Sequence, residues 1–191
     1  GQSDLLRLLL GDRRPSAGTA EIAGRPLPRS PSEAWARGIA FVPRERRTEG
    51  LMLGRSIAAN MVLPHLGRIS RAGLARTRRE EAAARPAAER LRLRFRRLSQ
   101  PVRLLSGGNQ QKVVIAKWLG TEPKILFMDE PTAGVDIGTK GEIVTMIRAF
   151  ADAGNSVIII SSELPEVLAV SDRVLILRDG RVDREMDRRE I

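Results

Sequence analysis

The segment LSGGNQQK at residues 105–112 indicates an anion-binding site. Gly107 and Gly108 have no side chains, so a ligand can approach the backbone closely, and Ser106 adds a hydroxyl group. The pattern VVIAKWL follows at once and predicts a helix, whose N-terminal N–H groups and positive dipole end favour a phosphate. Read alone, the same residues also fit an ordinary helix cap.

A second candidate is the pair of carboxylates in KILFMDEP at residues 124–131. The apolar run predicts a buried strand that delivers Asp129 and Glu130 to the carboxyl end of a parallel sheet, where such sheets bind ligands. One carboxylate can hold a hydrated Mg²⁺ and the other can polarise a water molecule. Alone, the pair also fits two carboxylates that cap the next turn, but the sequence PTAGVD after it favours a site.

Strands that alternate with helices must position these residues. The predicted strands lie within residues 18–27, 39–43, 124–131, 156–161 and 173–182, the last segment being a hairpin that turns at Asp179 and Gly180. The predicted helices cover residues 3–10, 30–37, most of 56–98, 107–119, 140–153 and 165–169, with a kink or split at Pro86. Residues 91–97, LRLRFRR, alternate between apolar and cationic side chains and predict a half-exposed strand or an extended arm.

This order of elements predicts an α/β fold with a mainly parallel sheet, flanking helices and a small antiparallel part. We expect a single domain over residues 1–191, interrupted by a helical subdomain at about 56–118. Hydrophobic residues make up 42% of the chain, enough for one sizeable core, and the absence of cysteine excludes disulfides and thiolate zinc sites. The net charge of +10 comes mostly from scattered arginines on a solvated surface, and 3% aromatics offer few stacking platforms for nucleic-acid bases.

Taken together, the motifs resemble those of ABC ATPases. LSGGNQQK resembles their signature motif in the variant of carbohydrate importers, ILFMDEP resembles their Walker B strand, and residues 133–136, AGVD, take the place of the D-loop. VPRERRTEGL at 42–51 and SSELPEVLAVSDRVLIL at 161–177 resemble the second nucleotide-binding half of ribose-, galactose- and xylose-type importers. The resemblance covers almost the whole chain and implies a P-loop NTPase-like fold.

The resemblance implies ATP and Mg²⁺ as cofactors and gives roles to individual residues. Glu130 takes the catalytic carboxylate position, and Ser162 takes the switch position, which is normally histidine. Ser3 and Asp129 take the Mg²⁺ positions. The nucleotide-binding positions are those of Gly1, Gln2, Ser3, Leu105, Ser106, Gly107, Gly108, Asn109 and Asp136.

Departures from the family pattern weaken the nucleotide site built on this chain's own phosphate loop. Gln2 stands where the phosphate-binding lysine belongs and cannot supply its charge, and Arg44 stands where these second halves usually carry Glu. We expect a degenerate phosphate loop, a weak Mg²⁺ site and a chain truncated at its N-terminus. The signature motif is complete, which predicts that Ser106 and the two glycines after it serve an ATP held by a partner half.

The resemblance implies an ATPase that couples ATP binding and hydrolysis to sugar uptake, with this half alone weak or inactive. The implied partners are another ABC nucleotide-binding half and a membrane permease, contacted through the region around 41–65 at the cytoplasmic face of a bacterial membrane. The transported solute does not touch the chain, and nucleic acid is not an expected partner.

Three alternatives stay open at this point. The first is a soluble ABC ATPase acting on RNA or DNA, although soluble translation factors usually read DEPTNHLD where this chain reads DEPTAGVD, and zinc-bearing repair ATPases need cysteines. The second is a structural half without an ATP role, which the complete signature motif argues against. The third is a fragment that does not fold stably.

Overall fold

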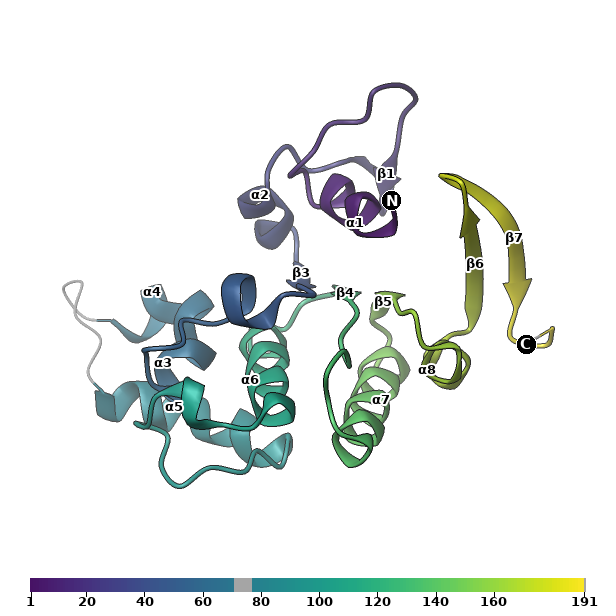
Figure 1. Cartoon of the computed structure of the whole chain (residues 1–191). Coiled ribbons are helices and arrows are strands. Elements are labelled where there is room, and N and C mark those ends of the chain that lie inside the picture. The colour runs from purple at the N-terminus through teal and green to yellow at the C-terminus, as the bar shows by residue number, and fades with distance from the viewer. Residues whose placement is uncertain (71–76, 191) are drawn as a thin grey trace.

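The computed structural model describes residues 1–70 and 77–190, and its centre is a three-stranded parallel sheet (Figure 1). Strand β4 (Ile125–Asp129) lies between β3 (Ile39–Val42) and β5 (Ser156–Ile160). Phe127 at the middle of β4 is in register with Phe41 on one side and Ile158 on the other. The predicted parallel sheet, with the motif KILFMDEP on its central strand, is therefore confirmed.

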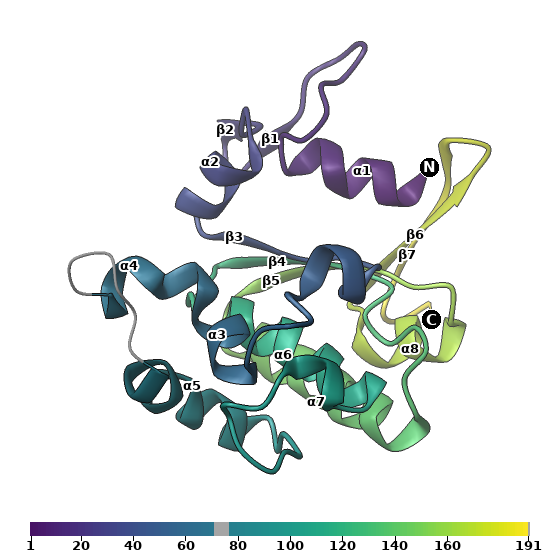
Figure 2. The same ribbon diagram turned by 60° about the vertical axis from the view of Figure 1, so that its left-hand side comes forward.

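Helices cover both faces of this sheet (Figure 2). On one face, α1 (Gln2–Leu9) buries Leu6 against Phe127, and α2 (Pro31–Ala36) leads into β3. On the other face, α6 (Gly107–Leu119) and α7 (Ile137–Asp152) pack against Leu126 and Met128. Side chains alternate between the two faces of a strand, so the unbroken apolar run of β4 is what a sheet covered on both faces requires.

Helices fill most of the region predicted as a helical subdomain. They are α3 (Ile57–Val62), the 3₁₀ turn η2 (Leu63–His65), α4 (Leu66–Ile69), α5 (Thr77–Arg90), the 3₁₀ turn η3 (Val102–Leu104) and α6. The predicted helical stretch 71–76 lies outside the described residues. Pro86 lies inside a continuous α5, so of the kink or split predicted there the split does not occur.

Two small antiparallel hairpins complete the architecture. One pairs β1 (Glu21–Ile22) with β2 (Arg25–Pro26), and the other pairs β6 (Arg173–Arg178) with β7 (Arg181–Asp187). The second hairpin turns at Asp179 and Gly180, both at positive φ, as the sequence predicts. A short helix, α8 (Leu164–Val170), joins β5 to this hairpin. The α/β fold with a small antiparallel part is confirmed.

Three local features refine or differ from the predictions. Helix α7 begins at Ile137 instead of residue 140, because Asp136 caps it. Of the two alternatives for residues 91–97, the strand does not form: Arg92 at φ 48° interrupts the alternation, and Leu91 and Leu93 are buried in the core. A five-residue π-helix, η1 (Arg46–Gly50), occupies a stretch for which the sequence predicts no helix. A short π-helical segment marks a local departure from ordinary helix geometry, often at a functional position.

Candidate functional site

The signature segment forms the start of α6. Ser106 is its N-cap, and its Oγ accepts hydrogen bonds from the Asn109 backbone N–H (3.4 Å) and side-chain amide (2.9 Å). The Asn109 side chain also accepts from the Arg94 N–H at 2.8 Å, and the Gln110 amide donates to the Leu105 carbonyl at 3.0 Å. These bonds hold the loop in front of α6 in one conformation, so the helix end has a fixed direction.

Gly107 and Gly108 lie where three parts of the chain meet. A Cβ at Gly108 would stand 2.8 Å from Thr139 Oγ1 and 3.1 Å from Asp136 Oδ2. A Cβ at Gly107 would stand 3.0 Å from an Arg46 guanidinium nitrogen. Packing therefore excludes a side chain at Gly108 unless Thr139 shifts, and leaves only tight space for one at Gly107.

Asp136, predicted as a D-loop residue, lies beside this glycine pair. Its carboxylate caps α7 by accepting from the Thr139 backbone N–H at 3.0 Å and from the Thr139 hydroxyl at 2.9 Å. These hydrogen bonds hold the pKa of the Asp136 carboxyl below its usual range, and the bond from the Thr139 backbone has the largest effect. The structure thus brings the signature and D-loop positions together in one place.

Asp129 and Glu130 lie buried at the carboxyl end of β4, where the sequence predicts them. The Glu130 N–H donates to the Ile160 carbonyl at 2.8 Å, and Glu130 adopts φ 46°, which turns the chain away from the sheet. Ser162 donates its hydroxyl to Glu130 Oε2 at 3.2 Å, so the residues predicted at the switch and catalytic positions contact each other within this chain. Among the described residues, buried Asp129 Oδ1 has no hydrogen-bond partner.

Gly1, Gln2 and Ser3 form the N-cap and first turn of α1, which lies across the sheet from α6 (Figure 2). Within residues 1–70 and 77–190, neither Gln2 nor Ser3 forms a side-chain hydrogen bond to Asp129. The Arg44 side chain is exposed, and the described part of the chain offers it no hydrogen bond or ion pair. Of the predicted site residues, the structure brings Gly108 next to Asp136 and Glu130 next to Ser162, and within the described residues no side-chain hydrogen bond joins Gln2 or Ser3 to either pair.

Among the described residues, no group of three or more His, Cys, Asp or Glu side chains is arranged to hold a metal ion. The unpartnered Asp129 oxygen fits a single carboxylate ligand of Mg²⁺, which usually takes one or two carboxylates and completes its shell with water and phosphate oxygens. The residues present therefore fit a Mg²⁺ ion that arrives with a nucleotide, and they do not form a complete protein cage.

Two cations that the sequence motifs do not mark contact backbone carbonyls in the structure, Arg46 beside the signature end of α6 and Lys117 in the last turn of that helix. The Arg46 guanidinium donates to the Ala133 carbonyl at 2.7 Å, and the Lys117 ammonium donates to the Gly50 carbonyl at 2.6 Å. Burial lowers the pKa of Lys117 to about 8. The sequence does mark Lys117, because it is a lysine inside the apolar run VVIAKWL and charged side chains are rarely fully buried.

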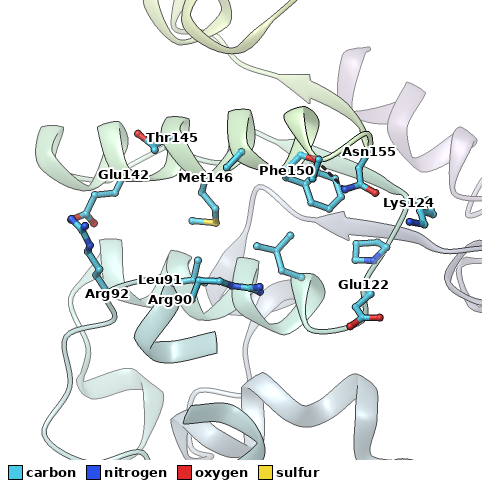
Figure 3. A pocket seen from close by; sticks show the side chains of 14 residues that line it. Arg90, Leu91, Arg92, Glu122, Lys124, Glu142, Thr145, Met146, Phe150 and Asn155 are labelled. Atoms are coloured by element: carbon cyan, nitrogen blue, oxygen red, sulfur yellow. Dashed lines mark hydrogen bonds between the residues drawn. The ribbon is translucent and has the colours of Figure 1, made fainter. Parts of the chain in front are cut away.

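A pocket lies away from all these motifs (Figure 3). It has a volume of about 680 Å³ and lies between the end of α5, the α6–β4 loop and α7. Leu91, Met146 and Phe150 line it together with Arg90. None of the signature, Walker B, D-loop or switch residues contributes to its wall, so we do not assign it to the nucleotide.

Comparisons with known proteins agree with this geometry. The family model described as ABC transporter matches residues 1–133. Ribose import ATP-binding protein RbsA 1 of Rhizobium meliloti (strain 1021) is 47% identical over 192 residues, and RbsA 1 of Agrobacterium fabrum is 49% identical over 191 residues. Both alignments cover 100% of this chain but only 38% of the relative, so the chain spans well under half the length of these proteins.

Solved structures show the same fold at lower identity. The dimeric ATP-binding cassette MJ0796 bound to ADP and Pi aligns with a TM-score of 0.81 at 23% identity, over 100% of this chain and 82% of that one. CbiO1 from Clostridium perfringens aligns with a TM-score of 0.78 at 23% identity, over 100% of this chain and 74% of that one.

In the described part of the chain, no helix combines the length and apolar character needed to cross a membrane. The matched family model and the relatives that align along the whole chain establish that this chain belongs to the ABC transporter family.

Proposed function

We propose that this chain is an ATP-binding half of an importer that couples ATP binding and hydrolysis to sugar uptake. The relatives that align over its whole length are named as ribose import ATP-binding proteins. A soluble ATPase acting on RNA or DNA is not favoured, because the arginines are scattered along the sequence and these relatives are import proteins.

We propose further that this half donates its signature motif to an ATP held by a partner half. The observation that carries this proposal is the end of α6, where Ser106 fixes the helix start, and Gly108, after a tightly packed Gly107, leaves no room for a side chain beside Thr139. The first turn of the helix has no acidic residue of its own, and Asp136, the carboxylate beside Gly108, is engaged in capping α7. An ATP γ-phosphate placed there meets backbone N–H groups that are already aligned, which stabilises charge during phosphoryl transfer.

The chain's own phosphate loop is, in this proposal, a poor site. Gln2 brings no positive charge to the start of α1, and Arg44 has no oxygen to offer a metal. Asp129 and Ser3 are the residues that would hold Mg²⁺, which when bound neutralises charge on the phosphates. Ser162 donates a hydrogen bond to Glu130, so it orients this carboxylate but cannot shuttle a proton as histidine does.

The permease is proposed to contact the region around residues 41–65, at the cytoplasmic face of the membrane. Met52 and Leu63 expose 48% and 39% of their surface in this region, which gives a partner helix apolar side chains to cover. In this arrangement no residue of the chain contacts the transported sugar, so the permease determines which sugar is transported.

An ATPase assay on the assembled transporter tests signature donation. Gly108→Asp puts a carboxylate at the helix end that faces the phosphate, and we expect it to remove most ATP turnover, whereas Gln2→Ala leaves turnover nearly unchanged. Gly141→Asp serves as a control for added charge: it places the same carboxylate on an α7 glycine whose Cβ would meet nothing within 4 Å. A strong loss with Gln2→Ala and none with Gly108→Asp would overturn the proposal.

A further inference from the structure

Arg46 connects the π-helix η1 to the turn that precedes Asp136. Its two terminal guanidinium nitrogens donate to neighbouring carbonyls, to Ala133 O at 2.7 Å and to Gly134 O at 3.3 Å. Gly134 adopts φ 64°, so the turn has the conformation that glycine permits most easily. A planar guanidinium can bridge two carbonyls in this way, whereas a lysine ammonium offers a single nitrogen.

The same guanidinium lies against the signature motif. An ideal Cβ on Gly107 would be 3.0 Å from Arg46 Nη2 and 3.3 Å from the Gly134 carbonyl. Arg46 Nε is buried without a hydrogen-bond partner, and within the described residues no carboxylate pairs with the Arg46 side chain. Neutral carbonyls therefore hold the Arg46 guanidinium between the helix end and the turn.

The remainder of η1 is anchored on two further helices. Lys117 of α6 donates to the Gly50 carbonyl at 2.6 Å, and a Cβ at Gly50 would stand 3.0 Å from Val114. At the other side of the segment, Arg7 of α1 pairs with both oxygens of Glu49 at 2.9 Å. These contacts fix η1 relative to α1 and α6, so Arg46 projects from a rigid support.

We propose that Arg46 is a positioning residue that holds the Ala133–Gly134 turn against Gly107, and that it thereby sets the geometry of the signature end of α6. This inference rests on the proposed function, because its consequence is a change in ATP turnover. Residues 46–50 lie inside the region that we assign to the permease contact. A displacement of that region moves Arg46, and through it the turn and the helix end, together.

The first experiment measures positioning without any ATPase assay. Amide hydrogen exchange is followed by mass spectrometry on the whole chain with Arg46→Ala, and with Arg47→Ala as the matched control. Arg47 is exposed in the same segment, and the described residues give its side chain no hydrogen bond or ion pair. We expect the segments 107–109 and 133–139 to exchange at least about tenfold faster in the first variant only. Equal exchange in both variants would overturn the inference.

The second experiment measures the consequence in the assembled transporter. We expect Arg46→Ala to lower kcat between about 10- and 100-fold, because a small misplacement of a group that stabilises the transition state is costly. KM for ATP should change less than about twofold, since the nucleotide sits on the partner's phosphate loop. Arg46→Lys should retain an intermediate kcat, and added methylguanidinium should restore kcat in Arg46→Ala but not change it in Arg47→Ala.

The outcomes separate this inference from the proposed function. If the unaltered transporter does not hydrolyse ATP, the proposed function is wrong, while the exchange measurement still decides whether Arg46 positions the turn. If the transporter hydrolyses ATP and Arg46→Ala matches Arg47→Ala in kcat, the proposed function stands and the positioning role is wrong. A loss of kcat that the lysine variant and methylguanidinium both fail to relieve would also contradict it.

Discussion

Raising the pH should stabilise this protein through a single buried lysine. Lys117 is only 6% exposed; its ammonium donates to the Gly50 carbonyl and lies 5.1 Å from the Trp118 ring, and no carboxylate among residues 1–70 and 77–190 pairs with it. Burial in these surroundings disfavours the charged form, so the pKa falls from 10.5 to about 8 in the folded chain.

The direction of the effect follows from the protons bound by each state. Between about pH 8 and pH 10.5, the folded chain holds Lys117 neutral while the unfolded chain holds it protonated, so unfolding takes up a proton and higher pH favours the folded state. Below this window the lysine is charged in both states and its penalty is fully present. At about 1.4 kcal/mol per pH unit, the free energy of unfolding should rise by about 3 kcal/mol across the window.

Urea unfolding followed by tryptophan fluorescence at a series of pH values measures this rise. The chain has no tyrosine and no cysteine, and arginine stays protonated, so few other groups titrate in the window. Lys117→Met should remove the rise, whereas Lys124→Met, at an exposed lysine, should keep it. A rise of equal size in Lys117→Met would refute the reasoning, as would a free energy of unfolding that stays constant in the unaltered chain.

Two further predictions concern stability. Gly11 and Gly18 share φ 76°, but a Cβ at Gly11 would stand 2.2 Å from the Pro28 carbonyl oxygen, whereas one at Gly18 would meet nothing within 4 Å. Gly18→Ala should therefore lower the free energy of unfolding by about 1 kcal/mol because of its backbone conformation, and Gly11→Ala should lower it by at least about 2 kcal/mol more. Thermal unfolding measures both losses, and equal losses would contradict this prediction. Thr132 donates a hydrogen bond to the buried Glu166 carboxylate. Thr132→Val should therefore lower the free energy of unfolding, measured by urea titration, by about 1–3 kcal/mol. An unchanged free energy would contradict this prediction and show that water replaces the hydroxyl.

Local patterns in the sequence predict most of the elements in this fold. The apolar run of β4 indicates a strand covered on both faces, and Ser30 and Ser106 mark helix starts because each side chain accepts from an N–H three residues later. These signals depend on neighbours along the chain, so they can be read without the structure. Pro86 shows the limit of such rules, since α5 continues through it while Ala84 and Ala88 stay buried in the core.

The π-helix η1 could not be predicted because its causes are distant in sequence. It depends on Arg46 reaching residues 133 and 134, on Lys117 reaching Gly50, and on the pair Arg7–Glu49. The approach of Asp136 to Gly108 is of the same kind: family resemblance predicts that both residues serve one site, but only the packing of α7 beside α6 shows why glycine is required there.

The measurement that tests the central proposal most directly is photocleavage of the assembled transporter with trapped ADP and vanadate. Vanadate takes the place of the transferred phosphoryl group, and ultraviolet light then cleaves the backbone that lies against it. We predict cleavage of this chain at residues 106–108, with the matching phosphate-loop cleavage on the partner half. Cleavage of this chain at residues 1–3, with none at 106–108, would contradict the account.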